Sequence, residues 1–188
     1  MNQDTRNQDT RNQGPDPDHS IHASAVLIGN QAALIRGPSG SGKSRLAFDL
    51  IVAGLAGQIP STTLVGDDRI HLALRNSKIV ARGAPGLAGL IEIRGLGLRR
   101  CDFTAEAPVG FIVDLAADDA ERMPPPEAFR AAILGIEIPR IPVGSGFQPL
   151  PLVIAALLTG PGSAPEPRPS PDCRKEFGNH ISPNIATE

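Results

Sequence analysis

The feature that most constrains the fold is a glycine-rich run at residues 37–44, with the sequence Gly-Pro-Ser-Gly-Ser-Gly-Lys-Ser. It satisfies the full pattern Gly-x-x-x-x-Gly-Lys-Ser/Thr, which is specific only between a strand and a helix. Both flanks are present. Ala32–Arg36 is a short apolar run, and Ser44–Ala53 places its apolar residues on one helical face, with Gly54 as a plausible C-cap. The run therefore predicts a strand–loop–helix unit that binds phosphate groups.

Each position of this loop suits an anion. The loop positions are Gly37, Pro38, Ser39, Gly40, Ser41, Gly42, Lys43 and Ser44. Glycines let the backbone curl around phosphate, while the N–H groups of the loop and of the helix N-terminus point at it. We expect Lys43 to be exposed to the β and γ phosphates of ATP, and the Ser44 hydroxyl to ligate Mg²⁺. ATP and Mg²⁺ are thus the predicted cofactors.

Two adjacent carboxylates follow the next strand candidate. Thr62–Val65 is β-branched and is followed directly by Gly66, Asp67 and Asp68. A phosphate loop needs a carboxylate near its metal, usually at the end of a neighbouring strand. One aspartate would hold metal-bound water and the other would accept a hydroxyl proton. The alternative is a solvated turn, because aspartate is common in turns.

A third carboxylate lies in the short strand candidate Leu90–Ile93. On a strand that continues through Arg94, Glu92 and Arg94 share one face, opposite Ile91. Such a pair suits a magnesium–phosphate group. The alternative is an exposed ion pair, which contributes little to stability.

The rest of the chain predicts one α/β domain with a mixed sheet. Residues 1–20 and the Pro-rich segment 161–188 are expected to be disordered tails around a folded domain at 21–160. Within that domain, turn residues join four apolar runs into two hairpins, and a further run forms a buried strand. The hairpin runs are Ala23–Gly29 with Ala32–Arg36 and Ile70–Leu74 with Lys78–Ala81, and the buried strand is Val109–Leu115.

Composition excludes several function classes. The formal net charge of −2 gives no basic surface for nucleic acid or for an anionic membrane. The apolar run Leu152–Leu158 is far shorter than the ~20 residues of a membrane span. Cys101 and Cys173 are too few for a zinc site or a disulfide framework. The N-terminal residues lack the apolar centre of a signal peptide, so we expect a cytoplasmic protein.

Five segments taken together resemble the catalytic domain of the HPr kinase/phosphorylase family over about residues 21–145. They are Ile21-His22-Ala23-Ser24, Gly37–Ser44, Gly66-Asp67-Asp68-Arg69, Ala84-Pro85-Gly86 and Ile91–Leu98 (IEIRGLGL). The last segment, combined with the phosphate loop and Asp-Asp-Arg, is the specific part. The resemblance implies a P-loop kinase core related to phosphoenolpyruvate carboxykinase.

The resemblance also implies the activity and the partner. Members of the family are serine kinases that use ATP to phosphorylate HPr, a small phosphocarrier of the bacterial phosphotransferase system. They also reverse the modification with inorganic phosphate and release pyrophosphate. The family forms hexamers, so a homo-oligomer is possible here. The main rivals are a P-loop kinase for a small hydroxylated metabolite and a non-catalytic nucleotide-binding regulatory module.

Roles for individual residues follow from the same resemblance. Lys43 would bind phosphate, while Ser44 and Glu92 would hold Mg²⁺. The Asp67-Asp68 pair would be the base for the serine hydroxyl and the acid in the reverse direction. His22 matches an active-site histidine of the family, and Arg122 matches a phosphate-contacting arginine. The alternative for each of these last two is an ordinary surface residue.

The sequence departs from the family at several places. It resembles the short form that lacks the additional N-terminal domain, and the Pro-rich tail stands where the family has C-terminal helices. The segment after Ile138 (IPRIPVGSGF) lacks the lysine and arginine pattern of the family segment tied to dephosphorylation. We therefore expect the reverse reaction to be slow.

Overall fold

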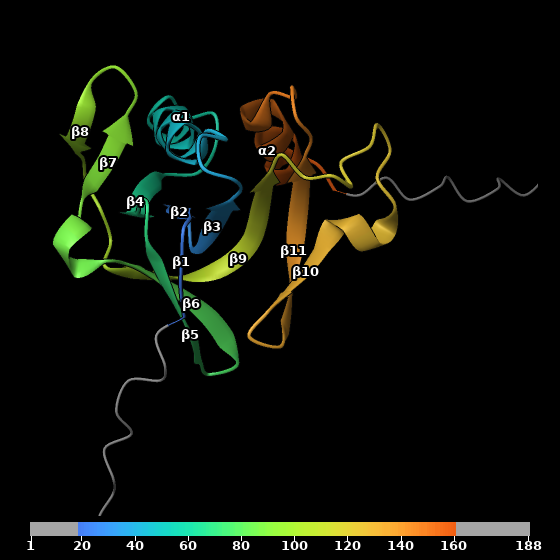
Figure 1. Cartoon of the computed structure of the whole chain (residues 1–188), viewed down its shortest axis with the longest axis horizontal. Helices are drawn as coiled ribbons and strands as arrows, with labels where there is room; N and C mark the ends of the chain where they lie inside the picture. Colours follow the sequence, from blue (N-terminus) through green and yellow to red (C-terminus); the bar gives the residue numbers. More distant parts are fainter. Residues whose placement is uncertain (1–18, 161–188) are drawn as a thin grey trace, which may run out of the picture.

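The computed structural model describes residues 19–160 (Figure 1). The two predicted tails lie outside these residues, except for His19 and Ser20, which begin the first strand. The described elements are β1 (His19–Ile21), β2 (Ser24–Ile28), β3 (Gln31–Arg36), α1 (Lys43–Leu55), β4 (Thr62–Gly66), β5 (Ile70–Arg75), β6 (Lys78–Gly83), η1 (Pro85–Leu87), β7 (Leu90–Ile93), β8 (Gly97–Arg100), β9 (Glu106–Leu115), η2 (Pro126–Phe129), β10 (Arg130–Ile133), β11 (Ile136–Val143) and α2 (Pro149–Leu158).

The main sheet is mixed, as the sequence predicts. It has nine strands in the order β1-β5-β6-β9-β3-β2-β4, with β11 pairing beside β9 and β10 beside β11. Strand β9 is parallel to both β3 and β11. Strand β4 also runs parallel to β3, because both are antiparallel to β2 between them. The carboxyl ends of β3, β4, β9 and β11 therefore meet at one edge of the sheet.

Two hydrophobic clusters cover the two faces of this sheet. Ile35 and Val113 pack in the cluster that contains helix α1, whereas their neighbours Leu34 and Ile112 pack in the cluster on the other face. This alternation is the period of two that a strand imposes on its side chains. Helix α2 packs in the same cluster as α1, through Val153, and both helices lie over one face (Figure 1). Within residues 19–160, no helix is long and apolar enough to cross a membrane.

Both predicted hairpins are confirmed. Strands β2 and β3 pair in antiparallel register around Gly29, which has φ 61°, and strands β5 and β6 pair around Asn76-Ser77. Asn76 and Ser77 both have positive φ, at 49° and 61°, which is the conformation of a tight two-residue hairpin turn. The turn residues thus predicted these connections correctly.

The predicted end of the first helix is wrong. Helix α1 runs to Leu55 and its C-cap is Ala56, so Gly54 lies inside the helix. A Cβ on Gly54 would lie 2.8 Å from Cβ of Thr62 at the start of β4. Gly54 is therefore needed for a close approach between helix and strand, which sequence alone does not distinguish from a cap.

Candidate active site

The glycine-rich loop forms an open cradle between β3 and α1. Gly40 and Gly42 have left-handed φ values of 78° and 97°, which favour glycine. No heavy atom within the described chain lies within 4 Å of a Cβ added at either position. Gly42 is the N-cap of α1 and gives no side-chain cap to the helix. The first N–H groups of this 13-residue helix therefore face the loop without a side-chain acceptor.

The start of the loop packs tightly against the end of β9. A Cβ on Gly37 would lie 2.7 Å from Ser41 Oγ and 2.9 Å from the carbonyl oxygen of Leu115. Ser41 Oγ is buried and has no hydrogen-bond partner within residues 19–160. A buried hydroxyl without a partner is costly, and an anion oxygen in the cradle would satisfy it. The loop therefore fits a bound phosphate group.

Lys43 crosses the loop from the first turn of α1. Its Nζ donates hydrogen bonds to the carbonyl oxygens of Gly37 at 3.0 Å and Pro38 at 2.9 Å. The residue is only 6% exposed, so the expectation of an exposed lysine is wrong. Burial lowers the pKa of Lys43, and the negative charges of Asp67 and Asp68 oppose that shift. The lysine and the aspartate pair therefore lie within electrostatic range of one another.

Asp67 is a buried carboxylate that joins three strands. It follows β4 directly and is 4% exposed. Its Oδ1 accepts a hydrogen bond of 2.5 Å from Ser24 Oγ on β2, and its Oδ2 accepts one of 3.1 Å from the backbone N–H of Glu92 on β7. These bonds fix the orientation of the Asp67 carboxylate.

Asp68 is the exposed member of the pair. Its backbone has φ 68°, a left-handed conformation in which an aspartate is uncommon but tolerated. His22, between β1 and β2, places its Nε2 3.3 Å from Asp68 Oδ1. The two side chains are 51% and 69% exposed, so both face solvent. The structure thus brings His22 and the aspartate pair together.

Glu92 contacts the site through its backbone N–H, which donates to Asp67, and its side chain is exposed. The neighbouring Ile91 is buried in the same cluster as Leu46 of α1, which places β7 beside that helix. Arg94 lies in the turn after β7, so the predicted shared strand face with Glu92 is wrong. The strand ends at Ile93 because residues 94–96 form the β7–β8 turn. No group of three or more His, Cys, Asp or Glu side chains within the described residues is placed to hold a metal ion.

Arg122 lies on a different segment from these residues. It is exposed, on the segment between β9 and η2, and no hydrogen bond or ion pair in the described chain joins it to the phosphate loop or to the aspartates. Instead it lines an apolar groove of about 930 Å³, beside Phe129 and Phe147. Its contact with a phosphate group stays a prediction.

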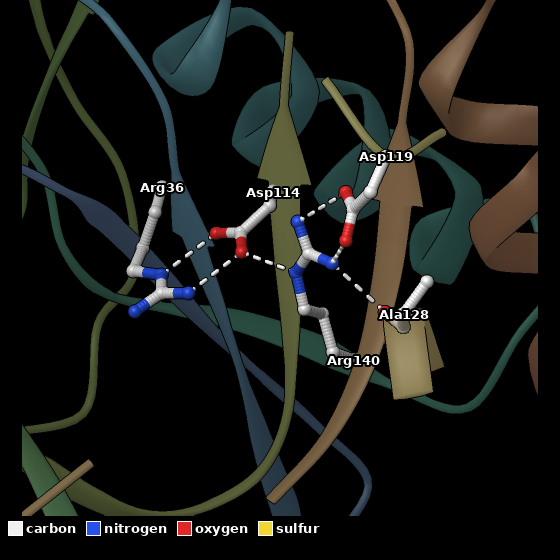
Figure 2. Close-up of polar contacts among 5 residues, drawn as sticks. All are labelled: Arg36, Asp114, Asp119, Ala128 and Arg140. Carbon is white, nitrogen blue, oxygen red and sulfur yellow. Dashed lines mark hydrogen bonds and ion pairs between the residues drawn. The ribbon is translucent and has the colours of Figure 1, made fainter. Parts of the chain in front are cut away.

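Sequence reasoning missed a further carboxylate at the same edge, Asp114, the penultimate residue of β9 (Figure 2). Arg36 donates from Nε and Nη2 to its two oxygens at 2.7 and 2.6 Å, and Arg140 Nε donates to Oδ2 at 2.5 Å. Burial raises the pKa of Asp114, but the hydrogen bonds and charges of the two arginines outweigh it and hold that pKa below its ordinary value. The signal available in the sequence was an acidic residue near the end of a strongly apolar strand.

Comparison with known proteins identifies the class and then the family. A glycine-rich loop between a strand and a helix, on a mixed sheet, defines a P-loop α/β protein. The chain belongs to the family of the HPr serine kinase C-terminal domain, whose family model matches residues 16–157. The predicted fold class and family are thereby confirmed.

Individual relatives agree with this assignment. The HPr kinase/phosphorylase of Mycoplasma mycoides subsp. mycoides is 34% identical over 145 residues, which is 69% of this chain and 44% of that protein. The HPr kinase/phosphorylase of Lactobacillus johnsonii is 40% identical over 83 residues, which is 44% of this chain and 24% of that protein. This chain therefore spans less than half the length of these relatives.

A solved structure shares the fold. The Hpr(Ser) kinase/phosphatase from Coxiella burnetii superposes with a TM-score of 0.58 and 26% sequence identity. The match covers 74% of this chain and 87% of that one.

Proposed function

We propose that this chain is a protein-serine kinase that uses ATP and Mg²⁺ to phosphorylate an HPr-type phosphocarrier protein. The observation that carries the proposal is the position of Lys43 across the phosphate loop, together with the fixed carboxylate of Asp67 at the end of β4. The family membership supports it, because the curated relatives are named HPr kinase/phosphorylase. In the reaction, the serine oxygen bonds to the γ-phosphorus, the bond from that phosphorus to the bridging oxygen breaks, and ADP leaves.

The loop residues account for nucleotide binding. Gly40 and Gly42 leave open space at their Cβ positions, which lets backbone N–H groups approach phosphate oxygens closely. Ser41 Oγ offers a buried donor without a partner in the described chain. Lys43, now bonded to two neutral loop carbonyls, would exchange those bonds for ones to phosphate, in which both the donor and the acceptor are charged.

The aspartate pair accounts for proton transfer. The serine hydroxyl must lose its proton as its oxygen attacks, and a carboxylate held near the phosphate loop can accept it. Asp67 is fixed by Ser24 and by the Glu92 backbone, whereas Asp68 is open to solvent beside His22. One carboxylate is thus preorganised near Lys43 and the other faces the side from which a protein acceptor arrives. In the reverse direction the same group returns the proton.

Ser44 and Glu92 are the residues that we propose to hold Mg²⁺. Oxygen ligands suit this ion, and it is bound by few protein groups together with substrate phosphates. When bound, Mg²⁺ supplies positive charge that neutralises the phosphate oxygens. The packing of β7 beside α1 and the anchoring of Glu92 to Asp67 support a shared site for these two residues.

The remaining expectations follow from the same proposal. Arg122, on the segment between β9 and η2, would contact a phosphate group bound at the loop. Phosphorolysis of phosphoserine-HPr by inorganic phosphate would be slow, because the segment after Ile138 lacks the lysine and arginine pattern of the corresponding family segment. An ATP-dependent kinase of a phosphocarrier works in the cytoplasm, where both substrates are, and a homo-oligomer is the expected assembly.

Incubation with γ-labelled ATP, Mg²⁺ and purified HPr, followed by mapping of the labelled residue, tests the proposal. We expect label on one serine of HPr, and none when alanine replaces that serine. ATP consumption without HPr, stimulated by a small hydroxylated metabolite, would instead identify a metabolite kinase. Nucleotide binding without transfer to any acceptor would identify a regulatory module.

A further inference from the structure

A chain of charged side chains links three parallel strands at the edge where their loops leave the sheet (Figure 2). Arg36 ends β3, Asp114 lies at the end of β9, and Arg140 lies on β11. Arg36 and Asp114 are register partners across the β3–β9 pair, and Asp114 pairs in register with Pro142, two residues beyond Arg140. All three side chains therefore lie on one face of the sheet, where they can form a continuous row.

Arg140 uses its guanidinium on three partners. Nε donates to Asp114, while Nη1 and Nη2 donate to the two oxygens of Asp119 at 2.6 and 2.9 Å. Nη1 also donates to the carbonyl oxygen of Ala128 in η2 at 2.8 Å. The planar fork of arginine suits this arrangement, because it fixes direction as well as distance, and a lysine cannot reproduce it.

The arginine contacts favour the ionised forms of Asp114 and Asp119, since the pKa of each carboxyl group is lowered. The hydrogen bond from Arg140 lowers the pKa of Asp119, and the hydrogen bond to Asp119 is the main cause that raises the pKa of Arg140. With Asp119 the row contains two arginines and two aspartates, whose charges cancel, so it does not attract an anion. Its contacts therefore point to a mechanical role.

The loops held by this row include both predicted phosphate-contacting segments. Gly37, the first residue of the phosphate loop, directly follows Arg36 and packs against Leu115 after Asp114. Asp119 belongs to the segment 116–125, which also carries Arg122. The backbone N–H of Ala117 donates to the carbonyl oxygen of Val143 at 2.9 Å, which fixes where this segment leaves β9.

We infer that Arg140, with Asp114 and Asp119, is a positioning device that fixes the 116–125 segment and its Arg122 relative to the phosphate loop, and that phosphoryl transfer depends on it more than nucleotide binding does. This inference rests on the proposed kinase function. None of these residues touches the reacting atoms; each acts through Arg122 or through the loop. Small displacements of a group that contacts the reacting phosphate cost rate steeply, which gives such a device its effect.

A substitution of Asp119 can distinguish a loss of positioning from a loss of folding stability. Its side chain is 47% exposed, and ion pairs at such exposure contribute little to folding. Glu106, which pairs with Arg75 and is 46% exposed, offers a matched control far along the sheet at the start of β9. Replacing either acid by its amide removes one exposed charge and keeps the shape.

The experiment compares Asp119→Asn, Arg140→Lys, the conservative Asp119→Glu and the control Glu106→Gln in the full chain. Transfer from γ-labelled ATP to HPr gives kcat and KM, binding of a fluorescent ATP analogue gives nucleotide affinity, and hydrogen exchange of residues 116–129 gives local order. Thermal unfolding is measured for each variant, and assays are run well below the lowest midpoint.

For Asp119→Asn and Arg140→Lys we expect kcat to fall about tenfold or more, nucleotide affinity to change less than about threefold, and exchange in 116–129 to rise about tenfold. Asp119→Glu should recover most of the rate, and Glu106→Gln should match the unmodified chain. Unchanged kcat in both variants, or unchanged exchange, would overturn the inference. If the unmodified chain transfers nothing to HPr, the proposed function fails, while exchange and nucleotide binding still decide whether the row holds the segment.

Discussion

Two acidic strand ends flank the strand that carries the phosphate loop, and the structure treats them in opposite ways. At the end of β9, Asp114 is bound by two arginines that occupy both of its oxygens. On the other side of β3, beyond β2, β4 ends in Asp67 and Asp68, which form no ion pair with an arginine or lysine in the described chain. A carboxylate next to a phosphate loop is thus not by itself a catalytic group.

The difference lies in the neighbouring cations. Arg36 and Arg140 neutralise Asp114 permanently, which makes it a structural and positioning group. Lys43 feels the charges of the β4 pair, which oppose the lowering of its pKa by burial, but its Nζ is bonded to loop carbonyls instead. The charge of the β4 pair therefore remains available for a metal-bound water or a proton.

The largest expected effect comes from removing the lysine of the phosphate loop. Lys43→Ala should lower phosphoryl transfer by about 10²- to 10³-fold, because a donor aimed at developing charge is lost. It should also cost some stability, since the carbonyls of Gly37 and Pro38 lose their donor. Transfer assays and thermal unfolding check both results. Lys78→Ala, on the exposed β5–β6 hairpin, is the control for loss of one positive charge. Near-normal transfer by Lys43→Ala would contradict the assignment of the loop.

The next effect concerns the neutralised acid and the pH. Asp114→Asn should lower the free energy of unfolding by about 2 kcal/mol at neutral pH, since hydrogen bonds to a charged group are lost and two arginines face each other. Because the folded pKa of Asp114 lies below the unfolded value of about 3.9, its stabilisation is present above pH ~4 and is lost as the pH falls through the folded pKa.

Urea unfolding of both proteins across pH 2.5–7 measures this difference. The gap between the unmodified chain and Asp114→Asn should be constant above pH ~5 and should shrink below pH ~4. A gap that does not depend on pH would mean that the Asp114 charge is not the source of the stabilisation.

A smaller effect is expected at Glu92. Glu92→Gln keeps the backbone N–H that binds Asp67 but removes one carboxylate charge from the proposed metal site. The Mg²⁺ concentration for half-maximal transfer should rise about tenfold, while the affinity for nucleotide without metal stays the same. Measuring transfer activity against Mg²⁺ concentration for both proteins tests this expectation. An unchanged Mg²⁺ requirement would remove Glu92 from the metal site.

The smallest effect on stability is expected for an exposed ion pair that lies away from the candidate site. Glu106→Gln breaks the exposed pair with Arg75 and should change the free energy of unfolding by less than about 0.5 kcal/mol. Thermal unfolding beside Asp114→Asn measures the contrast between a surface pair and a half-buried one. A loss as large as that of Asp114→Asn would show that exposure does not separate the two pairs.

The sequence predicted the elements whose signals are local. The phosphate loop, both hairpins and the strand before Asp67-Asp68 each carry their turn residues or periodicity within a few positions, and all are present. Strand β11 was missed because Pro139 and Pro142 argue against a strand. Its pairing with β9 supplies the hydrogen bonds that local sequence cannot reveal. Helix α2 was missed for a similar reason, since two prolines lie in its first turn, where they are tolerated.

The site was predictable only in part, for the same physical reason. The loop and the Asp67-Asp68 pair follow directly from motifs, but the ion pairs of Asp114 join residues 78 and 26 positions apart. Likewise, the burial of Lys43 depends on how the loop folds back over its own carbonyls. Contacts of this range are set by strand order and register, which the sequence of one chain does not disclose.

The most direct test of the account compares the two acidic strand ends in a single-turnover assay of transfer from saturating ATP to HPr. Asp67→Asn, Asp68→Asn and Asp114→Asn are measured together, with nucleotide affinity determined for each. One of the two β4 aspartates accepts the proton, and we expect its asparagine variant to lose about 10²-fold or more in rate with little change in nucleotide affinity. Asp114→Asn should lose about tenfold or less. Full rates in both β4 variants, or a larger loss in Asp114→Asn than in either of them, would contradict the account.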